Sequence, residues 1–380
     1  MDIRSLINPT PPSRVSTPSN AVPNDGPRKR KRTPLPASPS KQTSQRPRRK
    51  RHDPIPIWAI REGDMQPHAP PIQAPVQDDI ETDDAPEPAL EPSITNITPY
   101  DEITRSVCDF IWQNVVMNSA VRRALAESPD TQVEIEAKWG QMQDKRTGER
   151  FTGVHQTECV VDEMDLGDSI KFVSTMSEAQ HQKMNKFLNG CVTDAKGDRI
   201  RARAPLDYKH VKEIDKFFEL NHAGFEILSP ATKALLQTFL RKRVRLSRDM
   251  KTGRELGKII KHRIANLHIS SPKTEWDYRV SINLEINYPR AVNDLEPAAE
   301  SGLPQERKKD RMSYTHQNTY QIDLTQVVNE SGVKNHELEL ELYGDMLVRE
   351  ADKINQKLPS TYEGVVGMLV NNLRVLSRAI

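Results

Sequence analysis

Cysteines and long apolar runs are scarce in this chain of 380 residues. The three cysteines, Cys108, Cys159 and Cys191, are widely spaced, which argues against a disulfide framework and for a reducing compartment. No apolar run approaches the roughly 20 residues of a membrane helix, and no hydrophobic signal segment opens the chain. We therefore expect a soluble intracellular protein with no membrane partner.

Familiar phosphatase and zinc motifs are also absent. The chain has no G-x-x-x-x-G-K-[ST] loop, and none of its cysteines is followed six positions later by an arginine. No spacing of histidines and cysteines fits a zinc site.

Aromatic residues are few, and 19 of the 28 prolines fall within residues 1–97. Such a segment cannot bury enough apolar area to offset the entropy of ordering, so we predict a disordered tail before a folded domain at 98–380.

Residues 28–51 carry eleven Lys/Arg and no acid, whereas residues 78–91 carry seven acids and no base. Basic clusters are typical of nuclear import signals or loose nucleic-acid contacts. We predict a nuclear protein, and a solvated tail without a receptor is the alternative.

An apolar island, residues 55–61, interrupts the tail and contains Trp58. A tryptophan in a disordered, proline-rich segment suits a docking anchor that becomes ordered only when it enters a partner's groove. Composition alone equally allows an idle tryptophan.

Glutamates alternate with aliphatic residues in three segments. A period of two places the carboxylates on one face of a strand and the aliphatic side chains on the other. The carboxylates are Glu134 and Glu136, then Glu285, then Glu337, Glu339 and Glu341. Glutamate is depleted in strands. One such strand would most often face solvent, but three of them suit a closed barrel with a charged interior.

Basic side chains alternate in the same way elsewhere. The shared faces carry Arg243 with Arg245, then Arg307 with Lys309 and Arg311, and a third segment pairs Asp323 with Thr325. If all these faces point inward, carboxylates and cations line one lumen. Clustered carboxylates need cations, and oxygen ligands suit Mg²⁺ or Mn²⁺. Arg and Lys in turn suit phosphate oxygens. The pattern predicts a triphosphate site and metal-assisted hydrolysis of a phosphoanhydride.

Local signals predict eight or more strands and few helices between residues 130 and 343, which favours a barrel. The expected helices begin at Thr98-Pro99, at the capping box Ser177–Gln180 and at Ser229-Pro230, and the second and third end at Asn189-Gly190 and near Leu240. Turns are expected at 144–148, 194–198 and 249–253, a strand at 132–139, and an amphipathic helix at the end of the chain.

Four motifs together resemble the fungal mRNA-capping RNA 5′-triphosphatases, members of the triphosphate tunnel metalloenzymes. These motifs are residues 133–138, 306–316, 322–325 and 337–341, in the family's order. The resemblance implies a mainly β fold, a closed antiparallel eight-stranded barrel with flanking helices. It also implies hydrolysis of the γ-phosphate of 5′-triphosphate-ended nascent RNA, which leaves a 5′-diphosphate end as the first step of mRNA capping.

The resemblance further implies a role for each charged residue and a divalent cofactor, Mg²⁺ or Mn²⁺. Glu134, Glu136 and Glu341 would coordinate the metal, Glu339 and Glu285 would hold or activate water, and Arg245, Lys309, Arg311 and Lys261 would contact the γ-phosphate. Arg307, Asp323, Thr325 and Glu337 would support them, with Arg243 and Lys258 as second choices for phosphate contact.

The resemblance implies two protein partners as well. Residues 57–59, around Trp58, look like the segment that docks family members on the mRNA guanylyltransferase, although Arg61 follows where the family's second tryptophan is expected. Family members are homodimers, so a homodimer is expected. Two alternatives stay open: a tunnel enzyme acting on free nucleotides or inorganic polyphosphate, and a non-catalytic scaffold for capping partners.

Overall fold

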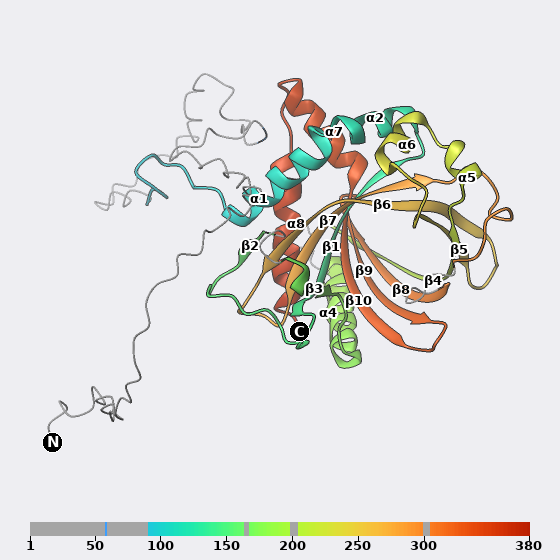
Figure 1. Cartoon of the computed structure of the whole chain (residues 1–380). Coiled ribbons are helices and arrows are strands. Elements are labelled where there is room, and N and C mark those ends of the chain that lie inside the picture. The colour runs from blue at the N-terminus through green and yellow to red at the C-terminus, as the bar shows by residue number, and fades with distance from the viewer. Residues whose placement is uncertain (1–57, 59–89, 163–166, 198–203, 299–304) are drawn as a thin grey trace, which may run out of the picture. The chain divides into compact units, whose positions relative to one another are not determined.

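The structure, a computed structural model, describes Trp58 and residues 90–162, 167–197, 204–298 and 305–380 (Figure 1). The basic clusters, most of the acidic run and the apolar island other than Trp58 lie outside these residues, so the predictions about them stay predictions. No helix in the described part of the chain is long and apolar enough to cross a membrane.

Eight antiparallel strands close into a barrel, as predicted. In their order around the barrel they are β1 (Gln132–Asp144), β10 (Lys334–Tyr343), β9 (Tyr320–Asn329), β8 (Glu306–His316), β4 (Leu206–Glu219), β5 (Arg243–Asp249), β6 (Glu255–Ser270) and β7 (Asp277–Asn287). β7 pairs with β1, and β1 also pairs with β10, which closes the ring. Two short strands, β2 (Cys159–Val161) on β6 and β3 (Ile170–Val173) on β1, extend the sheet.

The outer face of the barrel is apolar and is covered by helices. These are α1 (Glu102–Ile111), continued by a π-helical turn at Trp112–Val116, α2 (Ser119–Glu127), α4 (Glu178–Gly197), α5 (His222–Glu226), α6 (Pro230–Leu236), α7 (Gly344–Asn355) and α8 (Tyr362–Ser377). In Figure 1, α7 and α8 lie beside α1 on one side of the barrel, and α4 lies along β10. The barrel is therefore packed from outside and charged inside.

Specific contacts fix the C-terminal helices on β1. The Trp139 indole donates a 2.8 Å hydrogen bond to Ser377 Oγ on α8. Gly344 begins α7 where a Cβ would come within 2.0 Å of the Val133 carbonyl oxygen, so only glycine fits this close approach. These contacts hold the strand that carries Glu134 and Glu136.

The outward aliphatic side chains of the acidic strands are buried by the chain's own helices. Ile135, Leu340 and Leu342 are 0% exposed, and Val133 and Leu338 are nearly as buried. These faces therefore need no second copy to cover them, and the expected homodimer stays a prediction.

Three predicted boundaries are wrong. The first helix is capped by Asp101 instead of Thr98, since Asp101 Oδ2 accepts the Thr104 backbone N–H at 3.1 Å. The second continues past Asn189-Gly190 to Gly197, so the hairpin turn expected at 194–198 is helical through Gly197. Leu188 is buried and Asn189 Oδ1 accepts a 3.1 Å hydrogen bond from Tyr314 Oη, so packing against the barrel outweighs the local glycine stop signal. The third helix ends at Leu236 rather than near Leu240.

Other local predictions are confirmed. Ser177 and Gln180 form the reciprocal capping box, with backbone N–H to side-chain distances of 2.9 and 3.2 Å. Turns follow β1 at 144–148 and separate β5 from β6 at 249–253, each ending on a glycine with positive φ. The predicted strand at 132–139 forms the first part of β1, and the closing amphipathic helix is α8.

Candidate functional site

The barrel encloses a cavity of about 310 Å³ whose lining is almost wholly charged. Seven carboxylates and seven Lys/Arg side chains line it, with Thr325 and Val327. All first-choice site residues except Trp58 lie here: Glu134, Glu136, Arg245, Lys261, Glu285, Arg307, Lys309, Arg311, Asp323, Thr325, Glu337, Glu339 and Glu341. Side chains from seven strands thus share one lumen, and we call this cavity the tunnel.

The register between β1 and β10 sets the acidic wall. Glu136 lies directly opposite Glu341, and Lys138 lies opposite Glu339. Directly opposed side chains in an antiparallel pair are close neighbours. The two glutamate-rich strands are therefore adjacent, although about 200 residues separate them in sequence.

Cations hold the carboxylates of β1. The Lys261 ammonium group bonds to Glu134 and lies 3.2 Å from Glu136 Oε2. Asn283 Nδ2 donates to both glutamates, at 2.6 and 3.2 Å. Glu136 is only 3% exposed, so these partners replace the water that it would otherwise bind.

A second cation, Lys138, organises the β10 carboxylates. Its ammonium group bonds to Glu339 and lies 3.7 Å from Glu136 and 3.9 Å from Glu337. Burial opposes ionisation of Glu339, but Lys138 outweighs it and holds the pKa of Glu339 well below its usual value. Burial and the Glu339 charge raise the pKa of Glu337 to about 7. Neighbouring glutamates therefore differ in charge near neutral pH.

The opposite wall is basic and is organised by one buried acid, Asp215 of β4. This fully buried carboxylate accepts from Lys309 at 2.6 Å, Arg307 at 2.9 Å and Ser247 at 2.6 Å. Burial disfavours its charge, but Lys309 and Arg245 outweigh burial and lower the pKa of Asp215. It therefore stays ionised and fixes the direction of Lys309 and Arg307.

The remaining basic side chains are paired across the lumen. Arg311 contacts Asp323 at 3.0 Å, and Arg245 contacts Glu285 at 3.1 Å. Burial and the neighbouring Arg307 and Arg245 lower the pKa of Lys309 to about 8. Glu213 lies 4.0 Å from Lys309 and 3.8 Å from Arg311, so acids partner all the basic side chains of this wall. Their guanidinium and ammonium groups line the lumen, where such donors suit an anionic ligand.

The acidic wall fits a divalent cation by its chemistry. No ion pair among the described residues involves Glu341, and burial with the Glu134 and Glu285 charges raises its pKa to about 8. A bound cation would relieve this repulsion, and carboxylate oxygens are the ligands that Mg²⁺ and Mn²⁺ prefer. Within the described ranges no three acids, histidines or cysteines already form a coordinating group. Lys261 holds Glu134 and Glu136 instead.

Sequence reasoning missed three contributors to the tunnel: Lys138, Arg263 and Asp215. Lys138 and Arg263 line the cavity, and Asp215 lies beneath its basic wall. Each had a signal, since Lys138 continues the alternation of Glu134 and Glu136, and Arg263 that of Lys261. Asp215 alternates with Glu213 in the same manner. Their lower density of charge made these signals weaker.

The two second-choice cations lie outside the tunnel lining. Lys258 is three residues before Lys261 on β6 and so lies on the other face of the strand, where it pairs with Glu255 at 3.3 Å. Arg243 lines a neighbouring cavity and contacts Glu219 at 3.4 Å. Lys258 therefore offers a natural control for Lys261.

Trp58 is buried against its own chain. It is 4% exposed, packs on Tyr100 and Tyr362 with ring centroids 6.1 and 6.3 Å away, and donates a 3.0 Å hydrogen bond to Asp109 Oδ1. Its predicted role as a docking anchor stays a prediction. That role would require the indole to leave this intramolecular contact.

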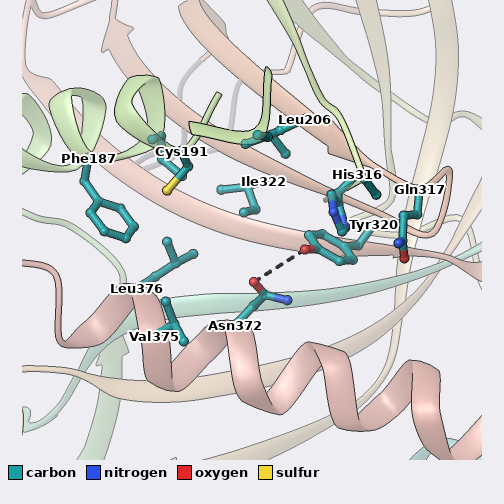
Figure 2. Close-up of a pocket in the computed structure, with 13 residues that line it drawn as sticks. Phe187, Cys191, Leu206, His316, Gln317, Tyr320, Ile322, Asn372, Val375 and Leu376 are labelled. Atoms are coloured by element: carbon teal, nitrogen blue, oxygen red, sulfur yellow. Dashed lines mark hydrogen bonds between the residues drawn. The ribbon is translucent and has the colours of Figure 1, made fainter. Parts of the chain in front are cut away.

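A separate cavity of about 400 Å³ lies outside the barrel, between α4, the start of β9 and α8 (Figure 2). Phe187, Ile322 and Leu376 give it an apolar lining, and Tyr320 Oη donates to Asn372 Oδ1 at 3.5 Å. It holds none of the predicted site residues.

Comparison with known proteins agrees with this geometry. The family described as "mRNA capping enzyme, beta chain" matches residues 97–380. The mRNA-capping enzyme subunit beta of Schizosaccharomyces pombe is 28% identical, over 69% of this chain and 80% of that protein. Its Candida albicans counterpart is also 28% identical, over 77% of this chain and 51% of that protein. The chain thus spans most of one relative and about half of the other.

Solved structures show the same fold. The S. pombe Pct1 RNA triphosphatase superposes with a TM-score of 0.60 at 25% identity, covering 77% of this chain and 99% of Pct1. A second Pct1 structure, in complex with the Spt5 CTD, gives the same TM-score at 26% identity. With the match over residues 97–380, these likenesses establish that the chain belongs to the mRNA-capping enzyme beta-chain family.

Proposed function

We propose that this protein hydrolyses the γ-phosphate of 5′-triphosphate-ended nascent RNA and leaves a 5′-diphosphate end, the first step of mRNA capping. The observation that carries the proposal is the tunnel itself, where seven carboxylates face seven Lys/Arg side chains in one cavity of about 310 Å³. A phosphate-binding wall beside an acidic wall is what phosphoanhydride hydrolysis needs.

The basic wall would bind the transferred phosphoryl group. Lys309 and Arg311 alternate on β8, and Arg245 lies on β5 across β4 from them. Their positive charge would neutralise the γ-phosphate oxygens and the charge that develops on them in the transition state. Asp215 would keep Lys309 directed into the tunnel.

The acidic wall would position the nucleophile. Glu339 stays ionised beside Lys138, so it can accept a hydrogen bond from the attacking water and orient it, while the proton of the water passes to the phosphate that forms. The water oxygen forms a bond to the γ-phosphorus as the bond to the bridging oxygen breaks. That oxygen leaves with the electron pair on the β-phosphate, and inorganic phosphate and the diphosphate end result. Glu285, whose carboxylate is held by Arg245, would be the second carboxylate that holds the attacking water.

Glu134, Glu136 and Glu341 would hold a Mg²⁺ or Mn²⁺ ion. When bound, this ion would polarise the γ-phosphate and offset its charge. Lys261 would then give up part of its contact with Glu134 and Glu136 and be available to the substrate.

Phosphate release from γ-labelled triphosphate-ended RNA, with Mg²⁺ or with a chelator, tests the proposal. We expect Glu134→Ala to lose about 100-fold in rate, while Glu178→Ala, at an exposed residue in the first turn of α4, keeps the wild-type rate. If Glu134→Ala released phosphate at the wild-type rate, the acidic wall would have no part in the mechanism. A protein active on free nucleotides or polyphosphate but inert on RNA would favour the nucleotide alternative, and one inert on all of them would favour the scaffold.

We also propose that the protein works in the nucleus, bound to the mRNA guanylyltransferase and as a homodimer. The basic residues 28–51 support the location, and the family of the chain supports the partners. Co-purification with the guanylyltransferase, with and without Trp58→Ala, tests the docking role, and sedimentation tests the dimer. Unchanged binding by Trp58→Ala would refute that role for Trp58.

A further inference from the structure

A second charged cavity adjoins the tunnel, and all its charge is positive. It has a volume of about 560 Å³ and seven Lys/Arg side chains in its lining, while no described residue of the lining is acidic. Four of the seven, Arg245, Lys261, Arg263 and Arg307, also line the tunnel. The two cavities are therefore neighbours, separated only by side chains that serve both. We call the second cavity the vestibule.

The vestibule lies where β5 and β6 separate. Their ladder runs from Arg248–Glu255 to Arg245–Ile259 and pairs no residues beyond that point. Arg243 and Lys261, which would pair two positions further along in this register, line the vestibule instead. The vestibule therefore lies beside the part of β6 that no longer pairs with β5.

Three cations line the vestibule beyond the tunnel: Arg241, Lys242 and Arg243. Arg241 is exposed and has a φ of +59°, a strained conformation for a residue other than glycine, just before β5 begins. Lys242 lies 3.4 Å from the His262 ring across the gap. Burial and the Lys242 charge lower the pKa of His262 to about 4, so this histidine adds no opposing charge.

Arg241 and Lys242 lie beyond the tunnel, so a triphosphate held by the tunnel's own basic side chains would leave these two available to a further anion. In an RNA that anion is the phosphodiester chain on the 3′ side of the first nucleotide. The vestibule floor adds the half-buried Phe217 ring, which lies 5.1 Å from the Arg307 guanidinium, and Ile259. An aromatic ring next to basic side chains is typical of single-stranded nucleic-acid sites.

We propose that the vestibule binds the sugar-phosphate chain that follows the 5′-triphosphate, with Arg241 and Lys242 as its phosphate contacts. This inference rests on the proposed function, because it places the RNA behind a triphosphate held in the tunnel. If this is correct, the preference for RNA over free nucleotides comes from a surface that does not contact the reacting atoms.

The test compares two substrates, a triphosphate-ended oligoribonucleotide of about ten nucleotides and free ATP. The variant is Arg241→Gln/Lys242→Gln, because glutamine removes the charges without a branched Cβ at the strained position. The control is Arg248→Gln, an exposed arginine in β5, the strand that follows these two residues. All three full-length proteins are assayed for phosphate release over a range of salt concentrations.

We expect the double variant to raise KM for the RNA about tenfold, with kcat for RNA and both constants for ATP unchanged. The slope of log KM against log salt should fall by about 1.4, about 0.7 for each lost single-strand phosphate contact. Arg248→Gln should match the wild type on both substrates. Equal KM values for the double variant and Arg248→Gln would overturn the proposal, as would an equal loss on RNA and ATP.

Direct binding separates this inference from the proposed function. A labelled 5′-hydroxyl RNA of the same sequence should bind the wild type more tightly than the double variant in fluorescence anisotropy. If the wild type released no phosphate from RNA but this difference remained, the triphosphatase proposal would fail and the vestibule proposal would stand. Equal binding would overturn the vestibule proposal, whatever the activity.

Discussion

Lys138 on β1 lies opposite Glu339 on β10, and its ammonium group bonds to that carboxylate inside the tunnel. The lysine also lies within 4 Å of Glu136 and Glu337, so it is the cation shared by the two acidic strands. Its position gives Lys138 a role in orienting the carboxylates that would handle water and metal.

We expect Lys138→Ala to lower the rate of γ-phosphate release by about 10–100-fold. Without the ammonium group, the buried Glu339 would lose the cation that it is hydrogen-bonded to, which would raise its pKa and free its orientation. Lys171→Ala, an exposed lysine on β3, is the control. An unchanged rate for Lys138→Ala would show that Glu339 does not act through this pair.

The charge of Lys309 sets an alkaline limit on activity. Its pKa of about 8 lies below the usual 10.5, so the ammonium group is charged below pH 8 and loses its proton as the pH rises through that value. We expect kcat/KM, which reports on the free enzyme, to decrease above about pH 8. Lys309→Arg should move this limb to higher pH, because arginine stays charged. If kcat/KM of Lys309→Arg decreased at the same pH as that of the wild type, the group that loses its proton would be a residue other than Lys309.

Asp215 should matter for stability as well as for orientation. Asp215→Ala leaves Arg307 and Lys309 without their buried partner, which we expect to lower the free energy of unfolding by about 3–5 kcal/mol. The wild-type contribution of this acid is present above the unfolded pKa of about 3.8 and is lost as the pH falls through its lower folded pKa. Thermal unfolding of wild type, Asp215→Ala and the exposed control Asp207→Ala at neutral pH measures the difference. A Tm equal to the control would contradict the assigned pairing.

Tryptophan fluorescence tests whether Trp58 rests on its own chain in solution. All four tryptophans, Trp58, Trp112, Trp139 and Trp276, are at most 6% exposed. Acrylamide should therefore quench the wild type weakly, and Trp58→Phe should lower the total emission without removing a strongly quenched component. A quenched fraction in the wild type that disappears in Trp58→Phe would show a solvated indole.

Much of the tunnel could be predicted because alternation is a local property of a strand. Glu134 with Glu136, and Arg307 with Lys309, needed only a period of two and the physics of opposed charges. The closure of β1 on β10 and the register of Glu136 opposite Glu341 depend on packing between distant segments. Alternation within one strand contains no information on this register. It predicted a barrel with a charged interior, and the resemblance to a family supplied the closed arrangement of eight antiparallel strands.

Local signals failed where tertiary contacts compete with them. Asn189-Gly190 would end an isolated helix, but the buried Leu188 and the bond from Tyr314 carry α4 on to Gly197. A lone tryptophan in a proline-rich segment contains no information on which surface it meets, so the contact of Trp58 with Tyr100 and Asp109 was not predictable.

The most direct test of the account compares two lysines on opposite faces of β6. Lys261→Ala and Lys258→Ala remove the same charge three positions apart, one inside the tunnel and one outside it. Release of the γ-phosphate from triphosphate-ended RNA should fall at least about tenfold in Lys261→Ala and stay at the wild-type rate in Lys258→Ala. Equal rates for the two variants would contradict the claim that the charged lumen of the barrel is the active site.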